Sequence, residues 1–203
     1  MIAVPPLRPT DASLRLLIRR FDGWLSRLEG VQPFTDDPRV ILRLQEGRLA
    51  WDVPLPDGTL CRRSSVMFVH LWNDRIPPIS PAGPDMVWAL RTQRALVYSF
   101  RAVAGHLIAT PRLDSIKAVG GTLAQIRLGR PDGGRALLVH LGFTIFPYHR
   151  PAGAFGEFWE NFYTWSLMWA FNPPSAARRG LLSLRRTEFW TTTSRFRARF
   201  GEA

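Results

Sequence analysis

A strand-like segment, a proline-rich break and a long helical segment constrain the fold of this chain more than any other feature. Residues 66–71, "VMFVHL", form an apolar run interrupted only by His70. Such a run is typical of a central strand with both faces buried. Prolines over 77–84 end this segment, and Asp85 is placed to cap a helix over 85–109.

The other segments add helices and strands in an irregular order. A proline-rich lead-in over 1–10 precedes a single domain over 11–203. The expected strands are 39–45, 48–55, 66–71, the start of 115–129, 135–149 and 181–190, and the expected helices are 11–29, 85–109, 154–171 and 192–201. Turns are expected at "EG" (46–47), joining the first two strands as a hairpin, and at "PDG" (56–58). This order predicts an α+β domain with a mixed, mostly antiparallel central sheet flanked by helices.

The first expected helix has a regular apolar face. Its members are Leu14, Leu17, Ile18, Phe21, Trp24, Leu25 and Leu28, while Arg15, Arg19, Arg20 and Arg27 lie largely off that face. The pattern favours an amphipathic helix docked on the core. The alternative is a helix lying at a membrane surface, with Trp24 at the boundary.

Two further expected helices carry side chains that do not fit on a single core-facing side. The segment 154–171 has aromatic residues around its whole axis, so it is either a central helix or partly exposed to something apolar. In the helix over 85–109, Arg91, Arg94 and Arg101 share one face, which is either a solvated face or a basic contact surface.

Composition narrows the class of protein. The 203 residues are 46% hydrophobic and 21% charged, which suits one globular domain. We expect no membrane span, no secretion signal and no internal disulfide, since Cys61 is the only cysteine, and these features favour a cytoplasmic protein. The net charge is +11, with Lys117 the only lysine. That charge favours anionic partners such as acidic lipids; nucleic acid is the third hypothesis, because no nucleic-acid-binding motif accompanies the charge.

Four histidines and a polar segment supply the candidate chemistry. His70 and His140 are expected inside apolar strands, where each needs a hydrogen-bond partner, and His106 and His149 do not stand out. Each of the first two is either a satisfied core histidine or part of a site. His70 is the candidate general base, with Asn73 and Asp74 as orienting groups. Four histidines and one cysteine do not suggest a metal site.

Several blocks of the sequence resemble the YkoP-like domain family. They are "VHLWNDRIPP", "IKAVGGTL", "LGFTIF", "WSLMWAFNPPSA" and "RRTEFWTTTSRFRARFG", and they cover most of residues 38–201. The most specific are the His-x-x-Asn-acid block at 70–74 and the closing block with Arg186, Glu188, Phe189 and Trp190. The resemblance implies a part in cell-envelope lipid or glycan metabolism.

The order of a central strand, a long helix and a short strand is also similar to that of GNAT-type acyltransferases. This likeness implies acyl-CoA or an acyl carrier protein as donor. The segment before the long helix, "ISPAGPDMVWALR", lacks the family's glycine pattern, and Asp85 has the wrong charge for a pyrophosphate. The donor site of the family is therefore not reproduced there.

Together these features give two main hypotheses. The first is a GNAT-like acyltransferase at the inner membrane face that acts on an amphipathic lipid or sugar acceptor. Its base is His70, its orienting groups are Asn73 and Asp74, and its substrate and anion contacts are Trp72, Arg75, Arg91 and Arg94. The second is a non-enzymatic domain that binds a lipid, a membrane or a protein, with His70 as a core residue.

Overall fold

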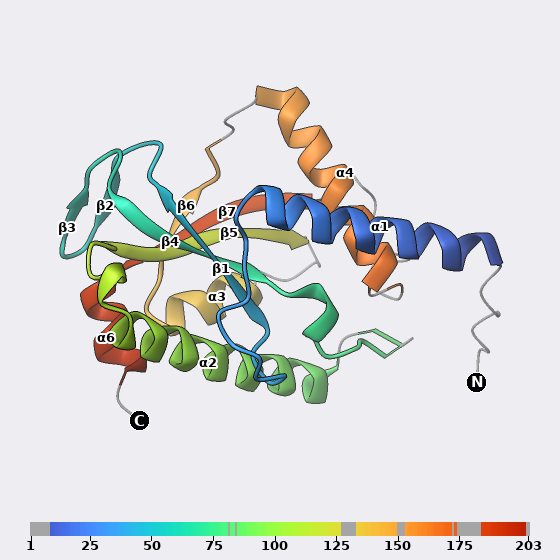
Figure 1. The fold of residues 1–203 in the computed structure, drawn as a ribbon, viewed down its shortest axis with the longest axis horizontal. Coiled ribbons are helices and arrows are strands. Elements are labelled where there is room, and N and C mark those ends of the chain that lie inside the picture. The colour runs from blue at the N-terminus through green and yellow to red at the C-terminus, as the bar shows by residue number, and fades with distance from the viewer. Residues whose placement is uncertain are drawn as a thin grey trace.

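A mixed five-stranded sheet forms the middle layer of the protein (Figure 1). The computed structural model describes residues 9–80, 82–83, 85–126, 133–149, 153–171, 173 and 184–201, so most of the expected lead-in lies outside the described residues. The strands, in spatial order, are β1 (Leu42–Arg48), β4 (Ser65–Leu71), β5 (Ala118–Ile126), β7 (Leu184–Thr192) and β6 (Thr144–Pro147). β2 (Val53–Leu55) and β3 (Gly58–Leu60) form a separate hairpin around the expected turn at 56–58.

The strand pairings confirm the α+β class with a mostly antiparallel sheet. β1 with β4, β5 with β7, and β6 with β7 are antiparallel, and β4 with β5 is parallel. A parallel pair needs a long crossover, which helix α2 (Met86–Ala109) supplies. The ladder between β4 and β5 runs only from Val66–Ala118 to Phe68–Gly120, although β5 continues to Ile126. The two strands therefore part toward their carboxyl ends.

Helices cover the two faces of the sheet in different ways. In Figure 1, α2, α3 (Gly133–His140) and α6 (Thr193–Phe200) lie on one side of the sheet, and α1 (Pro9–Leu28) and α4 (Gly153–Phe171) lie on the other. The first side holds the main core, in which buried sheet residues pack against α2 and α6; examples are Met67, Val119, Phe100, Leu107 and Phe196. Around α1 and α4, by contrast, many apolar side chains stay exposed.

Two glycines allow β5 to fit tightly between its neighbours. A Cβ atom on Gly120 would overlap the Phe189 carbonyl oxygen and the Trp190 indole, and one on Gly121 would lie 2.7 Å from the Val69 carbonyl oxygen. Trp190 is almost fully buried in a second apolar cluster with Val66 and Ala118. The close approach of these backbones explains the Gly-Gly pair within a strand.

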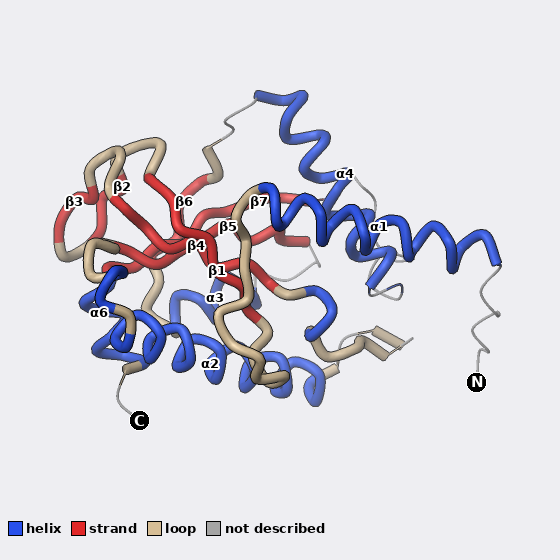
Figure 2. The backbone as a smooth tube through the Cα atoms, in the orientation of Figure 1, coloured by secondary structure: helices blue, strands red, loops and turns tan. Residues whose placement is uncertain are grey.

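Most long elements match the predictions, and three expectations were wrong. Asp85 caps α2 by accepting a hydrogen bond from the Trp88 N–H at 2.7 Å, as expected. The dipeptide at 46–47 is not a hairpin turn, because β1 runs through it and pairs there with β4. Figure 2 shows β1 and β4 as neighbouring strands. The segment 135–149 is not one strand: α3 occupies its first part, and Gly142, with a φ of 92°, separates α3 from β6. The first helix begins at Pro9 rather than after Asp11.

Candidate functional site

His70 lies near the carboxyl end of β4, where β4 parts from β5. After Leu71 and the extended Trp72, residues Asn73–Arg75 form a short 3-10 helix, η1. The Nε2 atom of His70 lies 2.8 Å from the side-chain oxygen Oε1 of Gln45. Within the described part of the chain, no hydrogen bond joins His70 to Asn73 or Asp74. The three side chains thus share a region without forming one connected group.

The surroundings of His70 favour its neutral form. Burial, followed by the positive charge of Arg43, lowers its pKa from 6.5 to about 4. The Gln45 oxygen can only accept, so Nε2 carries the proton of the neutral ring. A base with such a low pKa removes protons poorly near neutral pH. The part of His70 as general base stays a prediction, and its electrostatics do not favour it.

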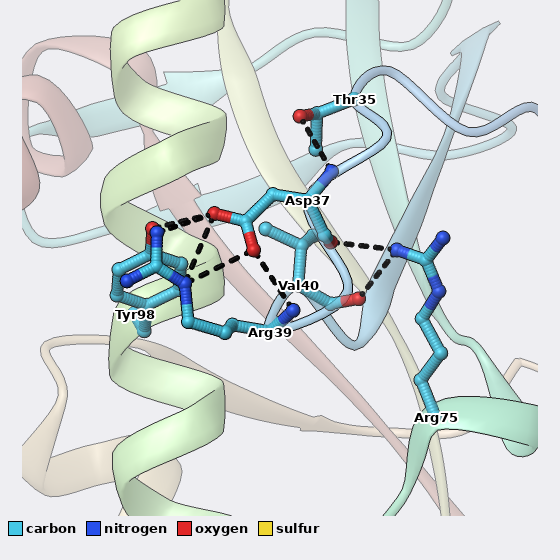
Figure 3. A network of polar contacts seen from close by, with 6 residues as sticks. All are labelled: Thr35, Asp37, Arg39, Val40, Arg75 and Tyr98. Atoms are coloured by element: carbon cyan, nitrogen blue, oxygen red, sulfur yellow. Dashed lines mark hydrogen bonds and ion pairs between the residues drawn. The ribbon is translucent and has the colours of Figure 1, made fainter.

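Arg75 and Trp72 hold a loop in place. The Arg75 guanidinium lies 3.6 Å from the centroid of the Trp72 ring. One of its nitrogens donates to the carbonyl oxygens of Asp37 at 2.7 Å and Val40 at 3.2 Å (Figure 3). These contacts give Arg75 a positioning role toward the loop that precedes β1, and its role as an anion contact stays a prediction.

The same loop is tied to α2 through the Asp37 carboxylate. Its oxygens accept hydrogen bonds from the Arg39 side chain and, at 2.7 Å, from the Tyr98 hydroxyl (Figure 3). These bonds, with that from Arg39 named first, hold the pKa of Asp37 far below its usual range. The network is structural, because every group in it bonds another part of the protein.

The predicted arginine face of α2 is exposed along the helix. Arg91, Arg94 and Arg101 are all exposed, and Arg94 and Arg101 border a shallow groove of about 350 Å³ with Leu90 and Tyr98. The helix is buried only from Ser99 onward. Arg91 and Arg94 therefore lie on α2 and not at the end of β4, and their role as anion contacts stays a prediction.

His140 occupies a place different from the expected one. It ends α3 instead of lying inside a strand, and its side chain is exposed. Its carbonyl oxygen accepts a hydrogen bond from Arg199 at 2.8 Å, which ties α3 to α6. The idea of a second histidine within an apolar strand is therefore wrong.

A buried carboxylate on β7 forms a second candidate group, which the sequence did not single out as chemistry. Glu188 is 2% exposed. Its Oε1 accepts the backbone N–H of His149 at 2.9 Å, and its Oε2 accepts the Trp190 indole N–H at 3.3 Å. The Nδ1 atom of His149 lies 3.5 Å from Oε1. The His149 ring also stacks on Trp51, with centroids 4.2 Å apart and planes 19° apart.

More polar side chains surround this group from α4 and β7. Glu160 accepts the Tyr148 hydroxyl at 2.6 Å and lies 3.4 Å from Arg186. Arg186 also donates to Asn161 and Thr164. The outer face of β7 is therefore polar beneath α4. One signal of this layer was available in the sequence: Glu188 and Arg186 interrupt an otherwise strand-like segment.

Helix α1 is attached to the protein by its polar side. Asp22 is buried, accepts the Tyr163 hydroxyl at 2.7 Å and lies 3.7 Å from the Arg43 guanidinium. Arg43 also donates to Ser26 at 2.9 Å. Arg15 and Arg19 lie over the rings of Trp169 and Phe171 on α4.

The apolar side of α1 faces outward, so the expectation that it docks on the core was wrong. Five members of the predicted face are exposed: Leu14, Leu17, Phe21, Trp24 and Leu28. On α4 the exposed aromatic residues are Phe155, Phe158, Trp159 and Phe162. Phe21 contacts the ring of Tyr163 on α4 edge-on, with centroids 6.1 Å apart. We call these nine residues the α1–α4 surface.

Comparisons with known proteins add no identification: no family model matches the chain, and no curated protein or solved structure shows significant similarity to it. Within the described residues, no helix has the length and hydrophobicity needed to cross a membrane.

Proposed function

We propose that the protein binds the surface of an anionic membrane through α1 and α4. The observation that carries this proposal is the orientation of α1, whose polar side contacts the protein and whose apolar side contacts solvent. Exposed apolar side chains gathered on two contacting helices mark sites that bind a protein or a membrane. A helix of this type lies in the membrane interface with its apolar side among the acyl chains.

Charge favours a lipid surface as the partner. Arg20 and Arg27 are exposed on α1 beside its apolar side, and the whole chain carries a net charge of +11. Basic residues near an acidic bilayer each contribute about 1 kcal/mol to binding. Trp24, which is 52% exposed, suits the boundary between headgroups and acyl chains.

Vesicle sedimentation tests this proposal. Wild-type protein should sediment with vesicles of phosphatidylcholine and phosphatidylglycerol, and less with phosphatidylcholine alone. Leu17→Glu and Trp24→Glu should each weaken binding at least about tenfold, because each places a charge where an apolar side chain enters the lipid. Val139→Glu is the matched control: Val139 is 54% exposed, but it lies on α3 across the sheet.

Two results would contradict membrane binding. One is equal sedimentation of Trp24→Glu and the wild type. The other is a dimer in analytical ultracentrifugation that Trp24→Glu converts to a monomer, without binding of the wild type to vesicles. That second result would assign the α1–α4 surface to a second copy of the chain.

Acyl transfer at the carboxyl end of β4 is the second candidate function that we propose. Ligands of sheets with crossover helices bind beyond the carboxyl ends of the strands, where neighbouring strands part. His70 lies near that end of β4, and η1 packs against α4, so this strand end adjoins a helix of the α1–α4 surface. The Asp85 carboxylate occupies the amino end of α2, which disfavours a CoA pyrophosphate at that point. Under this candidate the acceptor is an amphipathic lipid or sugar, and acyl carrier protein is the proposed donor.

Thermal-shift measurements with acyl carrier protein and acyl-CoA test the second candidate. A stabilisation by either donor that His70→Ala removes would support acyl transfer at the end of β4. A donor-independent melting temperature, with vesicle binding intact, leaves membrane binding as the function.

A further inference from the structure

Glu188 and His149 have the geometry of a carboxylate that orients an imidazole. The Glu188 side chain is almost fully buried, while the His149 side chain is 51% exposed. The Glu188 oxygen that lies 3.5 Å from Nδ1 also accepts the His149 backbone N–H at 2.9 Å, so the carboxylate contacts both the backbone and the ring of His149. Stacking on Trp51 restrains the plane of the imidazole further.

An imidazole held in this way acts as a base through its other nitrogen. A carboxylate beside Nδ1 favours the tautomer with its proton on Nδ1, which leaves the lone pair of Nε2 free to take a proton. His70 is the opposite case, since its partner is a neutral amide oxygen and a positive arginine lies near it.

Among the described residues, the charged neighbours of the pair are engaged with one another. Arg186, two residues before Glu188 on β7, lies 3.4 Å from Glu160 on α4, and Tyr148 bonds that same glutamate. The positive charge of Arg186 is therefore shared with Glu160. On the side of the β1–β2 connection, the neighbour is the Trp51 ring, which carries no charge.

We infer that His149 and Glu188 form a proton-transfer site for ester or thioester chemistry. Nε2 of His149 removes a proton from a water molecule or from a hydroxyl group of an acceptor, and the oxygen attacks the carbonyl carbon of the ester. The bond to the leaving alcohol or thiol then breaks, and the leaving group takes the proton from the imidazolium. In the acyl-transfer alternative, this places the base at His149 instead of His70. The inference does not depend on membrane binding.

Hydrolysis of p-nitrophenyl acetate in lipid-free buffer tests the site. The wild-type protein should release p-nitrophenolate, and His149→Gln should lower the second-order rate at least about tenfold. Glu188→Gln should lower it too. His106→Gln is the matched control, because His106 also lies against an aromatic ring, Phe34, with centroids 5.3 Å apart. That substitution should change the rate less than about twofold.

A measurement on the wild-type protein keeps the inference testable even if the variants do not fold. Long-range proton–nitrogen NMR at pH 8 should show His149 as the Nδ1–H tautomer, whereas free imidazole side chains favour Nε2–H. The inference is overturned if His149 is the Nε2–H tautomer, or if folded His149→Gln hydrolyses the ester at the wild-type rate. Neither result bears on vesicle binding, which is measured without the ester.

Discussion

The Nε2 atom of His70 on β4 lies 2.8 Å from the side-chain oxygen of Gln45 on β1, so an uncharged imidazole pairs with an uncharged amide. Burial and Arg43 lower the His70 pKa from 6.5 to about 4. The unfolded chain binds a proton at His70 below pH 6.5, and the folded protein does so only near pH 4. Stability from this group is therefore lost as the pH falls from 6.5 to 4.

The expected loss is about 2–3 kcal/mol of unfolding free energy. The unfolding free energies of the wild type and of His70→Leu are measured by urea denaturation at pH 7 and at pH 4.5. The wild type should lose this amount more than His70→Leu between the two pH values. His140→Gln, at an exposed histidine, is the control and should follow the wild type. A His70→Leu curve parallel to that of the wild type would show that His70 is accessible to protons in the folded state.

Glu188 gives a pH dependence of the opposite sign. Burial raises its pKa above 4.5, and the hydrogen bonds from His149 and Trp190 offset only part of that increase. The folded protein therefore retains a proton that the unfolded chain has already lost, and stability falls as the pH rises from 4.5 through the raised pKa.

Replacing Glu188 by Gln should remove this decrease. The difference in unfolding free energy between wild type and Glu188→Gln is expected to change with pH above 4.5. Glu46→Gln, at an exposed ion pair with Arg112, is the control. Its unfolding free energy should differ from that of the wild type by an amount that stays constant above pH 4.5. Because His70 and Glu188 act in overlapping pH ranges with opposite signs, each variant must be compared with the wild type at every pH.

The close fit at Gly120 predicts a strong effect of one methyl group. Gly120→Ala would push Cβ into the Phe189 carbonyl and the Trp190 indole, and it should cost about 3 kcal/mol of stability. Gly105→Ala is the control, because nothing lies within 4 Å of its Cβ position in α2 and alanine is the better helix former. That variant should gain about 0.5–1 kcal/mol in chemical denaturation. Equal melting temperatures for the two variants would contradict the packing described here.

The elements that could be predicted from the sequence carry strong local signals. α2 has a capping aspartate at its start, and α4 is bounded by glycine and proline. β4 has a continuous apolar run. The prediction of one strand over 135–149 was wrong because "ALLV" fits a strand and a helix equally well. Only packing against the sheet decides between them. At 46–47 the turn signal was local, but pairing with β4 extended β1 through it.

The orientation of α1 and the contacts between residues far apart in the chain could not be predicted from the sequence. Periodicity identified the apolar side of α1 but not the direction in which it points, because that depends on Asp22 meeting Tyr163 and Arg43. The candidate site shows the same limit. His70 was noticed for its apolar neighbours, whereas His149 is distinguished only by Glu188, 39 positions away, which folding brings beside it.

The attachment of α1 gives a last prediction. Asp22 and Arg43 are both largely buried, and Asp22 also accepts the Tyr163 hydroxyl. Asp22→Ala leaves a buried guanidinium without its carboxylate and should cost about 3 kcal/mol locally. Since the apolar side of α1 adds little packing against the sheet, that loss should detach the helix. Limited trypsin digestion should then cleave after Arg19, Arg20 or Arg27 much faster than in the wild type. Asp36→Ala, at an exposed aspartate, should leave the rate unchanged. Unchanged cleavage of Asp22→Ala would mean that the cation–π contacts of Arg15 and Arg19 with α4 suffice to hold α1.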